Sequence, residues 1–339
     1  MSTPGDAAPL CPVTGLPAAR RVQQVTTRLL TDLWRITFGV DARSSFRGVE
    51  RLGLWESPTG LYFFDPPLEG DGQFYSGYYD RSIGRRSTEA GREEFSIAAR
   101  HIRPNSRVLD VGCGRGHFRR FIPQCDYTGI DPHPPAESAT DDVRRETLTQ
   151  HLAGRAGFYD AVCCFQVIEH VRDPKRLFAE LVQAAKPGGL ICVAVPHVPS
   201  AFTRIPNFLI NAPPHHLTWW SKEALAALAK SAGAVVERIE TAPWGPEDSM
   251  IYWIERCSPF KCRDVHYRGA ALWHTAALAG YLLGTVAFKL LGAPKGSPDE
   301  GAGLLMFARK PETSPPFFPV RSSTRQFAPG PRHDRAHGG

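Results

Sequence analysis

The sequence lacks several features that would place the protein in common classes. Its N-terminus has no basic start followed by an apolar run, so we expect a cytoplasmic protein without an export signal. Lys and Arg outnumber Asp and Glu by 40 to 34, but aromatic and basic residues do not interleave as in nucleic-acid-binding modules, and we expect no nucleic-acid partner. The eight cysteines are consistent with a reducing compartment, where thiols inside strands behave as small apolar groups.

The central region contains an alternation of short β-rich runs and helical patterns. This alternation predicts a parallel sheet covered by helices on both faces. Two runs, Tyr159–Phe165 and Leu190–Val195, are continuously apolar, as strands buried on both faces require. The other expected strands are Arg107–Val111, Tyr127–Ile130, Val235–Glu240 and, as the last strand of the sheet, Gly303–Lys310.

Two helices have clear start and stop signals. Asp173 followed by Pro174 is typical of a helix N-terminus, and the run from Lys186 to Gly189 is expected to end that helix. Ser221 is expected to cap a second helix that ends near Gly233.

The strand expected at Arg107–Val111 runs directly into a G-x-G-x-G loop that begins at Gly112. Glycine lets the backbone turn sharply and approach a ligand closely, and the following helix N-terminus favours a negative group. Asp131 ends the next strand, where a carboxylate accepts the ribose hydroxyls of an adenosine ligand; the alternative is a structural role in the turn before Pro132. The two features predict a pocket for a nucleoside that carries a carboxylate. Dinucleotide enzymes have G-x-G-x-x-G at this point, so the spacing disfavours an oxidoreductase.

Four motifs stand in the order and spacing of one family: VLDVGCGRGHF at Val108–Phe118, GIDP at Gly129–Pro132, YDAVCCFQVIEHVRDP at Tyr159–Pro174 and KPGGLICVAVPH at Lys186–His197. On these motifs the chain resembles the class I S-adenosylmethionine (SAM)-dependent methyltransferases, in particular the group of ubiquinone-pathway O-methyltransferases. The resemblance covers roughly residues 93–240. It implies an α/β fold with a doubly wound, mostly parallel, seven-stranded Rossmann-like sheet, and S-adenosyl-L-methionine as the cofactor.

The resemblance also implies a set of cofactor-binding residues. The glycine loop would hold the methionine part of SAM, Asp131 the ribose, and Gln166 would line the site near the sulfonium. We expect the adenine contact after the third strand, at Thr147 and Leu148. The full set is Asp110, Gly112, Cys113, Gly114, Gly116, Asp131, Thr147, Leu148 and Gln166.

Three histidines are candidate catalytic residues. His215 and His216 lie in a segment that resembles the family's substrate-facing segment, and His170 belongs to the family's Glu-His pair. A histidine of near-neutral pKa can take a proton from the acceptor as the methyl group moves. The alternative for all three is a packing or loop-stabilising role. Because the sulfonium is already activated, methyl transfer mainly requires alignment of donor and acceptor, and we expect no metal.

The N-terminal segment departs from the family pattern. Cys11–Gly15 resembles half of a zinc-binding element that precedes some methyltransferase domains, including sugar C-methyltransferases, but Thr14 replaces its second cysteine. Glu56 and Thr59 stand at the positions of the second pair. Thiolates supply most of the affinity of such a site, so we expect no zinc here. Cys257, Cys262 and His266 form a second set of possible metal ligands, but no fourth ligand is evident, and we expect no metal there either.

We divide the chain into an N-terminal cap (1–92), a SAM-binding core (93–245), an insertion with an apolar helix (246–300), the last core strand (301–311) and a disordered tail (312–339). The aromatic stretch Phe74–Asp80 is expected to cover the cofactor or to pack within the cap. The run Gly269–Leu291 is apolar nearly all round and of marginal length for a membrane span. We favour a helix packed on its own domain or on a dimer partner, with a membrane-surface helix or a span as alternatives.

The sequence therefore predicts a SAM-dependent methyltransferase that acts on a small or lipid-like molecule. An oxygen acceptor is favoured, and peripheral membrane contact would run through residues 269–291. One alternative is sugar or nucleotide-sugar C-methylation, which the remnant of the zinc element suggests. The other is a non-catalytic SAM-binding scaffold or regulatory protein. The acceptor and the oligomeric state are not specified by the sequence, since substrate pockets vary within one fold.

Overall fold

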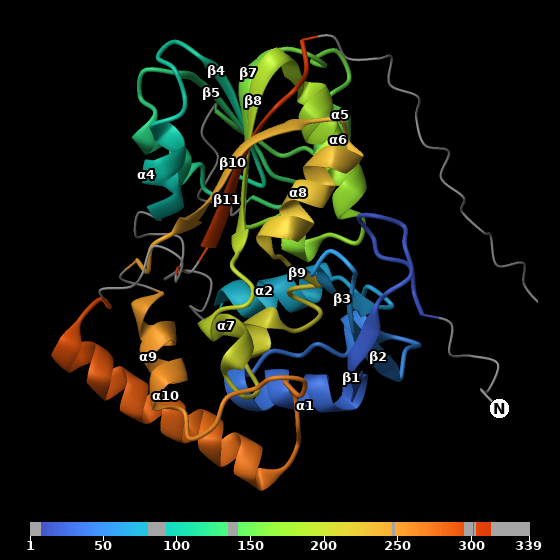
Figure 1. The fold of residues 1–339 in the computed structure, drawn as a ribbon, viewed down its shortest axis with the longest axis vertical. Coiled ribbons are helices and arrows are strands. Elements are labelled where there is room, and N and C mark those ends of the chain that lie inside the picture. The colour runs from blue at the N-terminus through green and yellow to red at the C-terminus, as the bar shows by residue number, and fades with distance from the viewer. Residues whose placement is uncertain are drawn as a thin grey trace, which may run out of the picture.

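The computed structural model of the protein describes residues 8–80, 93–134, 142–245, 248–294, 301 and 303–312. The tail predicted to be disordered lies outside these residues from position 313 onward. The main element is a seven-stranded sheet with the strand order β10-β11-β8-β7-β4-β5-β6 (Figure 1). Its strands are β4 (Arg107–Val111), β5 (Asp126–Ile130), β6 (Val143–Arg144), β7 (Tyr159–Phe165), β8 (Ala185–Pro196), β10 (Val235–Ala242) and β11 (Gly303–Arg309).

The strands β6, β5, β4, β7 and β8, which follow one another in the sheet, run parallel. In contrast, β11 runs antiparallel to both of its neighbours, β8 and β10. This confirms the predicted doubly wound, mostly parallel sheet. All six strands expected from the sequence are present, and β8 extends beyond the predicted Leu190–Val195 at both ends. The two-residue strand β6 was not predicted, because so short a segment carries no periodicity.

Helices cover both faces of this sheet (Figure 1). On one face lie α5 (Leu148–His151), α6 (Pro174–Ala184) and α8 (Lys222–Ser231), and on the other lie α4 (Glu93–Ala99) and the 3₁₀ turn η2 (His117–Phe121). Neighbouring strand residues alternate between the two cores, so that Cys163 packs under α4 and Cys164 under α6. Both thiols are fully buried, as predicted, and burial raises their pKa well above the usual value.

The two helices with clear sequence signals begin where they were predicted. Asp173 Oδ1 accepts a hydrogen bond from the backbone N–H of Arg176 (2.9 Å), and Ser221 Oγ accepts one from that of Ala224 (3.1 Å). Each bond satisfies a donor that the first helical turn leaves without an intrahelical partner. The caps thereby determine where α6 and α8 start on the sheet.

A second sheet is antiparallel and has the strand order β1-β2-β3-β9. It lies below the main sheet in Figure 1, beside α1 (Thr27–Phe38) and α2 (Gly72–Asp80). Its own core contains the fully buried Trp34, Phe64 and Phe74. The last strand, β9, comes from the second half of the chain and joins the N-terminal region to the rest. The strands are β1 (Arg20–Thr26), β2 (Arg51–Glu56), β3 (Tyr62–Asp65) and β9 (Thr218–Trp219).

Hydroxyl groups hold the two turns that resemble a zinc element. Thr14 Oγ1 accepts a hydrogen bond from the backbone N–H of Leu16 (3.3 Å). Ser57 Oγ accepts from the N–H groups of Thr59 (3.3 Å) and Leu61 (3.0 Å). Side-chain hydroxyls therefore make the local turn bonds here, and Cys11 is buried in the main core.

The segment before β11 contains α7 (Ala201–Arg204), α9 (Ser249–Cys257) and α10 (Ala271–Leu291). α10 lies along the outside of the molecule and packs on α9 (Figure 1). Only its small residues Ala276, Gly280 and Gly284 are buried, whereas Leu272 and Leu290 are 70% and 78% exposed. The helix is long and apolar enough to cross a membrane, and 17% of its most apolar window is buried. The expected packing of α10 on its own domain is therefore limited to the narrow face that these small residues form.

We predict that Gly284→Ala destabilises the protein by about 1 to 2 kcal/mol. A Cβ at this position would lie 2.5 Å from Ile254 N and 2.6 Å from Ile254 Cα in α9, and backbone atoms cannot move aside cheaply. Overpacking costs about 1–3 kcal/mol, which exceeds the gain of about 1 kcal/mol in helix propensity. Urea unfolding would measure the change, with the exposed Leu282→Ala as a near-neutral control. A stabilised Gly284→Ala protein would contradict the close packing of the two helices.

Candidate active site

The glycine loop between β4 and η2 is held in a conformation that favours glycine. Gly112, Gly114 and Gly116 have φ angles of 70°, 54° and 69°, in the left-handed region where a Cβ is unfavourable. At Gly112 space is limiting as well, because a Cβ would collide with the side chain of Val167. At Gly114 no atom of the described residues lies within 4 Å of the Cβ position, so the loop is open on that side.

Asp131 follows β5 and faces the glycine loop. Its Oδ2 accepts a hydrogen bond from the backbone N–H of Gly114 (3.0 Å), and its Oδ1 accepts one from that of His133 (2.7 Å). Asp131 therefore has the turn role that the sequence left open as an alternative to ribose binding. The two roles are compatible, because each carboxylate oxygen accepts more than one hydrogen bond.

Two further predicted residues lie behind the loop. Asp110, near the end of β4, is buried, and the hydroxyl of Tyr127 donates to its Oδ2 (2.8 Å). Burial and the neighbouring Asp110 raise the pKa of Tyr127, so its hydroxyl remains a donor. Burial also raises the pKa of the Cys113 thiol, with Asp110 and Asp131 adding to the effect, and the thiol stays protonated.

The other three predicted cofactor residues differ in their surroundings. Gln166 follows β7 with a φ of 56°, and its Nε2 donates to Glu94 Oε2 (3.4 Å). Because β7 pairs with β4, Gln166 emerges beside the glycine loop. Thr147 instead caps α5 through reciprocal bonds with Gln150, and Leu148 is buried in the core. The side chain of Thr147 thus makes hydrogen bonds within its own helix cap, and that of Leu148 packs in the core.

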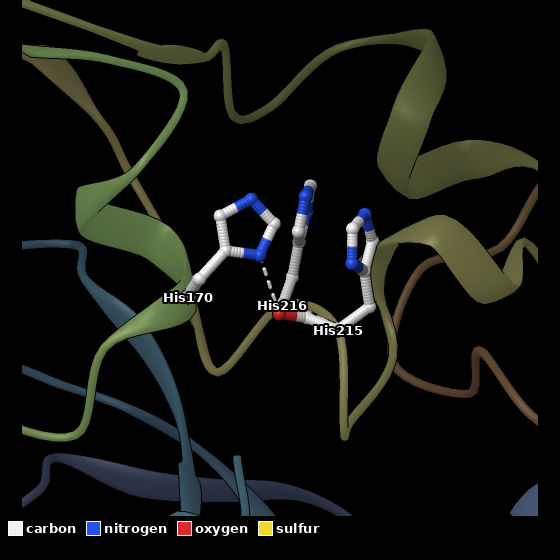
Figure 2. A group of neighbouring side chains, drawn as sticks. All are labelled: His170, His215 and His216. Carbon is white, nitrogen blue, oxygen red and sulfur yellow. Dashed lines mark hydrogen bonds between the residues drawn. The ribbon is translucent and has the colours of Figure 1, made fainter. Parts of the chain in front are cut away.

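The structure brings together the three histidines that the sequence singled out (Figure 2). His170 ends the 3₁₀ turn η4 (Ile168–His170) after β7, whereas His215 and His216 precede β9. One ring nitrogen from each histidine lies within 4.8 Å of the others. The rings of His215 and His216 are stacked, with centroids 4.7 Å apart and an interplanar angle of 19°. We refer to these three residues as the histidine cluster.

Hydrogen bonds to backbone atoms connect the loop that carries His215 and His216 to both sheets. His170 Nδ1 donates to the carbonyl oxygen of His215 (2.7 Å), as the dashed line in Figure 2 shows. The N–H of Leu217 donates to the carbonyl oxygen of Glu169 (2.8 Å), and the carbonyl oxygen of Leu217 accepts from Phe64 in β3 (2.9 Å). The cluster is therefore tied to the cofactor side of the main sheet and to the small sheet.

The buried histidines of the cluster are neutral at physiological pH. His215 and His216 are 8% and 5% exposed. Burial lowers the pKa of both well below the usual value, because it disfavours the charged imidazolium, and the nearby His170 adds to this effect. Neutral imidazoles retain a nitrogen lone pair that can accept a proton or bind a cation.

Aromatic side chains of α1 and α2 surround His215. The ring centroids of Tyr78, Tyr75 and Trp34 lie 4.7 Å, 6.1 Å and 6.3 Å from that of His215. Tyr75 and Tyr78, from the aromatic stretch Phe74–Asp80 that we expected over the cofactor or within the cap, therefore pack against His215 of the histidine cluster. The result is a site with polar histidines next to aromatic walls.

Sequence reasoning missed three residues that shape the site. Asn211 Oδ1 accepts a hydrogen bond from His216 Nδ1 (3.2 Å), Glu94 accepts from Gln166, and Val167 packs against the Gly112 backbone. A signal existed for Asn211, which is one of two amide side chains, with Asn207, in an otherwise apolar stretch before the histidines. Glu94 and Val167 could be assigned only after the strand order was known.

Comparisons with known proteins identify a methyltransferase domain in this chain. Residues 81–239 match a family model described as a methyltransferase domain. A ubiquinone biosynthesis O-methyltransferase of Xanthomonas campestris is 26% identical over 196 residues, which cover 52% of this chain and 80% of the relative. The enzyme of the same name from Escherichia coli is 35% identical over 95 residues, covering 24% and 40%. Among solved structures, a 1,6-didemethyltoxoflavin-N1-methyltransferase of Burkholderia thailandensis has a TM-score of 0.45 at 17% identity, covering 74% of this chain and 95% of that one.

The strand order and the matching domain define the class of the protein: it is an enzyme that transfers methyl groups from S-adenosyl-L-methionine, its cofactor. Residues 81–239 thus form a methyltransferase domain of the class I SAM-dependent type, and the chain is similar to the ubiquinone biosynthesis O-methyltransferases.

We predict that Gly112→Ala lowers the affinity for S-adenosylhomocysteine at least tenfold. The new Cβ would collide with Val167 and shift the loop, in addition to the strain of a left-handed φ. Gly157→Ala is a matched control, since Gly157 has a φ of 67° but no atom of the described residues within 4 Å of its Cβ position. Isothermal titration calorimetry would measure both variants. Equal affinities in the two would show that the loop backbone does not shape the cofactor pocket.

We predict that acid destabilises the protein through the histidine cluster. The unfolded histidine pKa is about 6.5, and the folded values of His215 and His216 are lower, so each group's stabilising contribution is present above pH 6.5 and is lost as the pH falls. Each of the two histidines would lower the free energy of unfolding by up to about 1.4 kcal/mol at pH 5.5, the limit set by the unfolded pKa. Urea unfolding at pH 7.5 and 5.5 should show a smaller loss for His216→Gln than for the wild type or the exposed-site control His133→Gln. The same loss in all three proteins would exclude His216 as a source.

Proposed function

We propose that the enzyme transfers the methyl group of SAM to an oxygen atom of a small or lipid-like acceptor held against the histidine cluster. The observation that carries this proposal is the position of two buried, neutral histidines on a loop bonded to Glu169, three residues after Gln166. A hydroxyl acceptor loses its proton during methyl transfer, and a neutral imidazole can take it. His216 or His215 would receive this proton, with His170 next to them.

The remaining site residues receive roles in the same proposal. The glycine loop from Gly112 to Gly116 would hold the methionine part of SAM, and Asp131 would bind the ribose hydroxyls while it keeps the turn bond to His133. Gln166 would line the site near the sulfonium. Since the side chains of Thr147 and Leu148 have local roles, the adenine contact there would come from main-chain atoms.

The surroundings of the cluster favour an aromatic or lipid-like acceptor. Tyr75, Tyr78 and Trp34 offer ring faces beside His215, and aromatic rings stack well on one another. Two similar proteins are named as O-methyltransferases of ubiquinone biosynthesis, which supports oxygen as the acceptor atom. The exposed leucines of α10 are suited to peripheral contact with a membrane, where lipid-like acceptors reside.

The proposal is tested by a labelled-methyl screen of the purified enzyme with quinols and phenols in one set and nucleotide-sugars in the other. We expect turnover in the first set and label on oxygen. Label on a sugar carbon would favour the rival C-methyltransferase, which is suggested by the turns at Cys11–Gly15 and Ser57–Gly60.

Two aspartates at opposite ends of β5 provide the matched variants for this assay. Asp131→Ala should lower the affinity for S-adenosylhomocysteine at least tenfold, because it removes the proposed ribose acceptor. Asp126→Ala, at the exposed start of the strand, should bind as the wild type does. Undiminished binding by Asp131→Ala would refute the assigned pocket, whatever the acceptor screen shows.

A further inference from the structure

The histidine cluster has a geometry that is unusual for three structural histidines. One nitrogen of each ring lies within 4.8 Å of the other two, although His170 is far from His215 and His216 in the sequence. Three ligands around a zinc-sized ion would lie about 3.3 Å apart in a tetrahedral site with metal–nitrogen distances of about 2.05 Å. Side-chain rotations that bring these nitrogen atoms up to about 1.5 Å closer together would reach this spacing.

The hydrogen bonds around the cluster determine which nitrogen atoms carry lone pairs. The carbonyl oxygen of His215 can only accept, so the Nδ1 atom of His170 carries a hydrogen and its Nε2 has the lone pair when the ring is neutral. Asn211 Nδ2 donates to the carbonyl oxygen of Phe202 (2.9 Å), which leaves Asn211 Oδ1 as the acceptor of the His216 Nδ1 hydrogen. The Nε2 atoms of His170 and His216 therefore carry the lone pairs.

These bonds match the surroundings of metal-binding histidines. A histidine ligand almost always donates its second ring N–H to a backbone carbonyl, an amide or carboxylate oxygen, or a water, which sets its tautomer and its orientation. His170 and His216 both do so. The third ring, His215, has a buried Nδ1 without a hydrogen-bond partner among the described residues, an arrangement that a bound cation would satisfy.

We propose that His170, His215 and His216 bind one divalent transition-metal ion. Imidazole ligands suit Zn²⁺, Co²⁺, Ni²⁺ and Fe²⁺, whereas Mg²⁺ and Ca²⁺ prefer oxygen ligands. Three histidines leave one position of a tetrahedral ion open, as in catalytic zinc sites. His170, whose side chain is 22% exposed, is the least buried of the three and would give an acceptor access to the ion.

The charges near the cluster favour a cation there. The fully buried carboxyl group of Glu169 lies beside the cluster, with its Oε1 3.8 Å from His170 Nε2. When ionised, it offsets part of the charge of a dication in a buried environment.

The metal would deepen the proposed function rather than replace it. An acceptor hydroxyl bound at the open position would lose its proton more readily, because a coordinated dication lowers the pKa of a bound oxygen ligand. With their lone pairs on the metal, His215 and His216 would no longer take the proton, which would pass to the ionised carboxylate of Glu169 beside the cluster. Metal binding itself does not require the proposed acceptor, so the two can be tested separately.

The test begins with tag-free protein that has been stripped with a chelator. Zinc sulfate is titrated into it at pH 7.5 by isothermal titration calorimetry, and cobalt chloride is added to a second sample for absorption spectroscopy. We expect one site per chain and the intense visible bands of tetrahedral Co²⁺. His170→Gln should weaken zinc binding at least tenfold, whereas His274→Gln, which changes a histidine on α10, should bind zinc as the wild type does.

S-adenosylhomocysteine titration and thermal unfolding of each variant show whether it is folded. The cobalt spectrum of the wild type tests the site even if His170→Gln fails to fold. Less than half a zinc per chain in the wild type, a spectrum of octahedral cobalt, or equal affinity in folded His170→Gln would overturn the proposal. Zinc binding without methyl transfer to any acceptor would leave the metal site standing and remove only the proposed function.

Discussion

The position of β4 between β5 and β7 determines where the candidate site residues lie. Parallel neighbours end at the same edge of a sheet, so the glycine loop after β4, Asp131 after β5 and Gln166 after β7 emerge together. No contact between their side chains is needed to bring them there. Once the strand order is set by packing under α6 and α4, the cofactor half of the site follows from chain direction alone.

The histidine cluster, where we place the methyl acceptor, depends on a different constraint. This constraint is the attachment of the loop before β9 to both sheets. Leu217 bonds to Glu169 on the main-sheet side and to Phe64 in β3, while Trp34 Nε1 donates to the carbonyl oxygen of Pro213 (2.9 Å). This loop therefore cannot move away from η4 without breaking bonds to the N-terminal region. The small sheet acts as a support that holds His215 and His216 against His170.

Local signals explain what could be predicted from the sequence. The buried strands, the caps at Asp173 and Ser221, and the glycine loop all depend on residues close together in the chain. The pairing of β9 with β3 and the meeting of His170 with His215 depend on contacts far apart in the chain, for which periodicity carries no information. The sequence left the surroundings of α10 open for a related reason: its composition suits a core, an interface or a membrane surface, and only the tertiary structure shows that small residues alone face α9.

Several features that oppose stability lie together at one edge of the sheet. Gln166 adopts a left-handed φ, two histidines are buried, and Glu169 is fully buried beside them. Each of these features opposes stability on its own, since strained φ angles cost about 1–3 kcal/mol and buried ionisable groups lose solvation. The cores on both sides of the sheet show no comparable conflict, because apolar strand residues alternate cleanly between them. A left-handed φ and buried ionisable groups therefore occur side by side where the glycine loop meets the histidine cluster, and such departures from local rules are expected at functional sites.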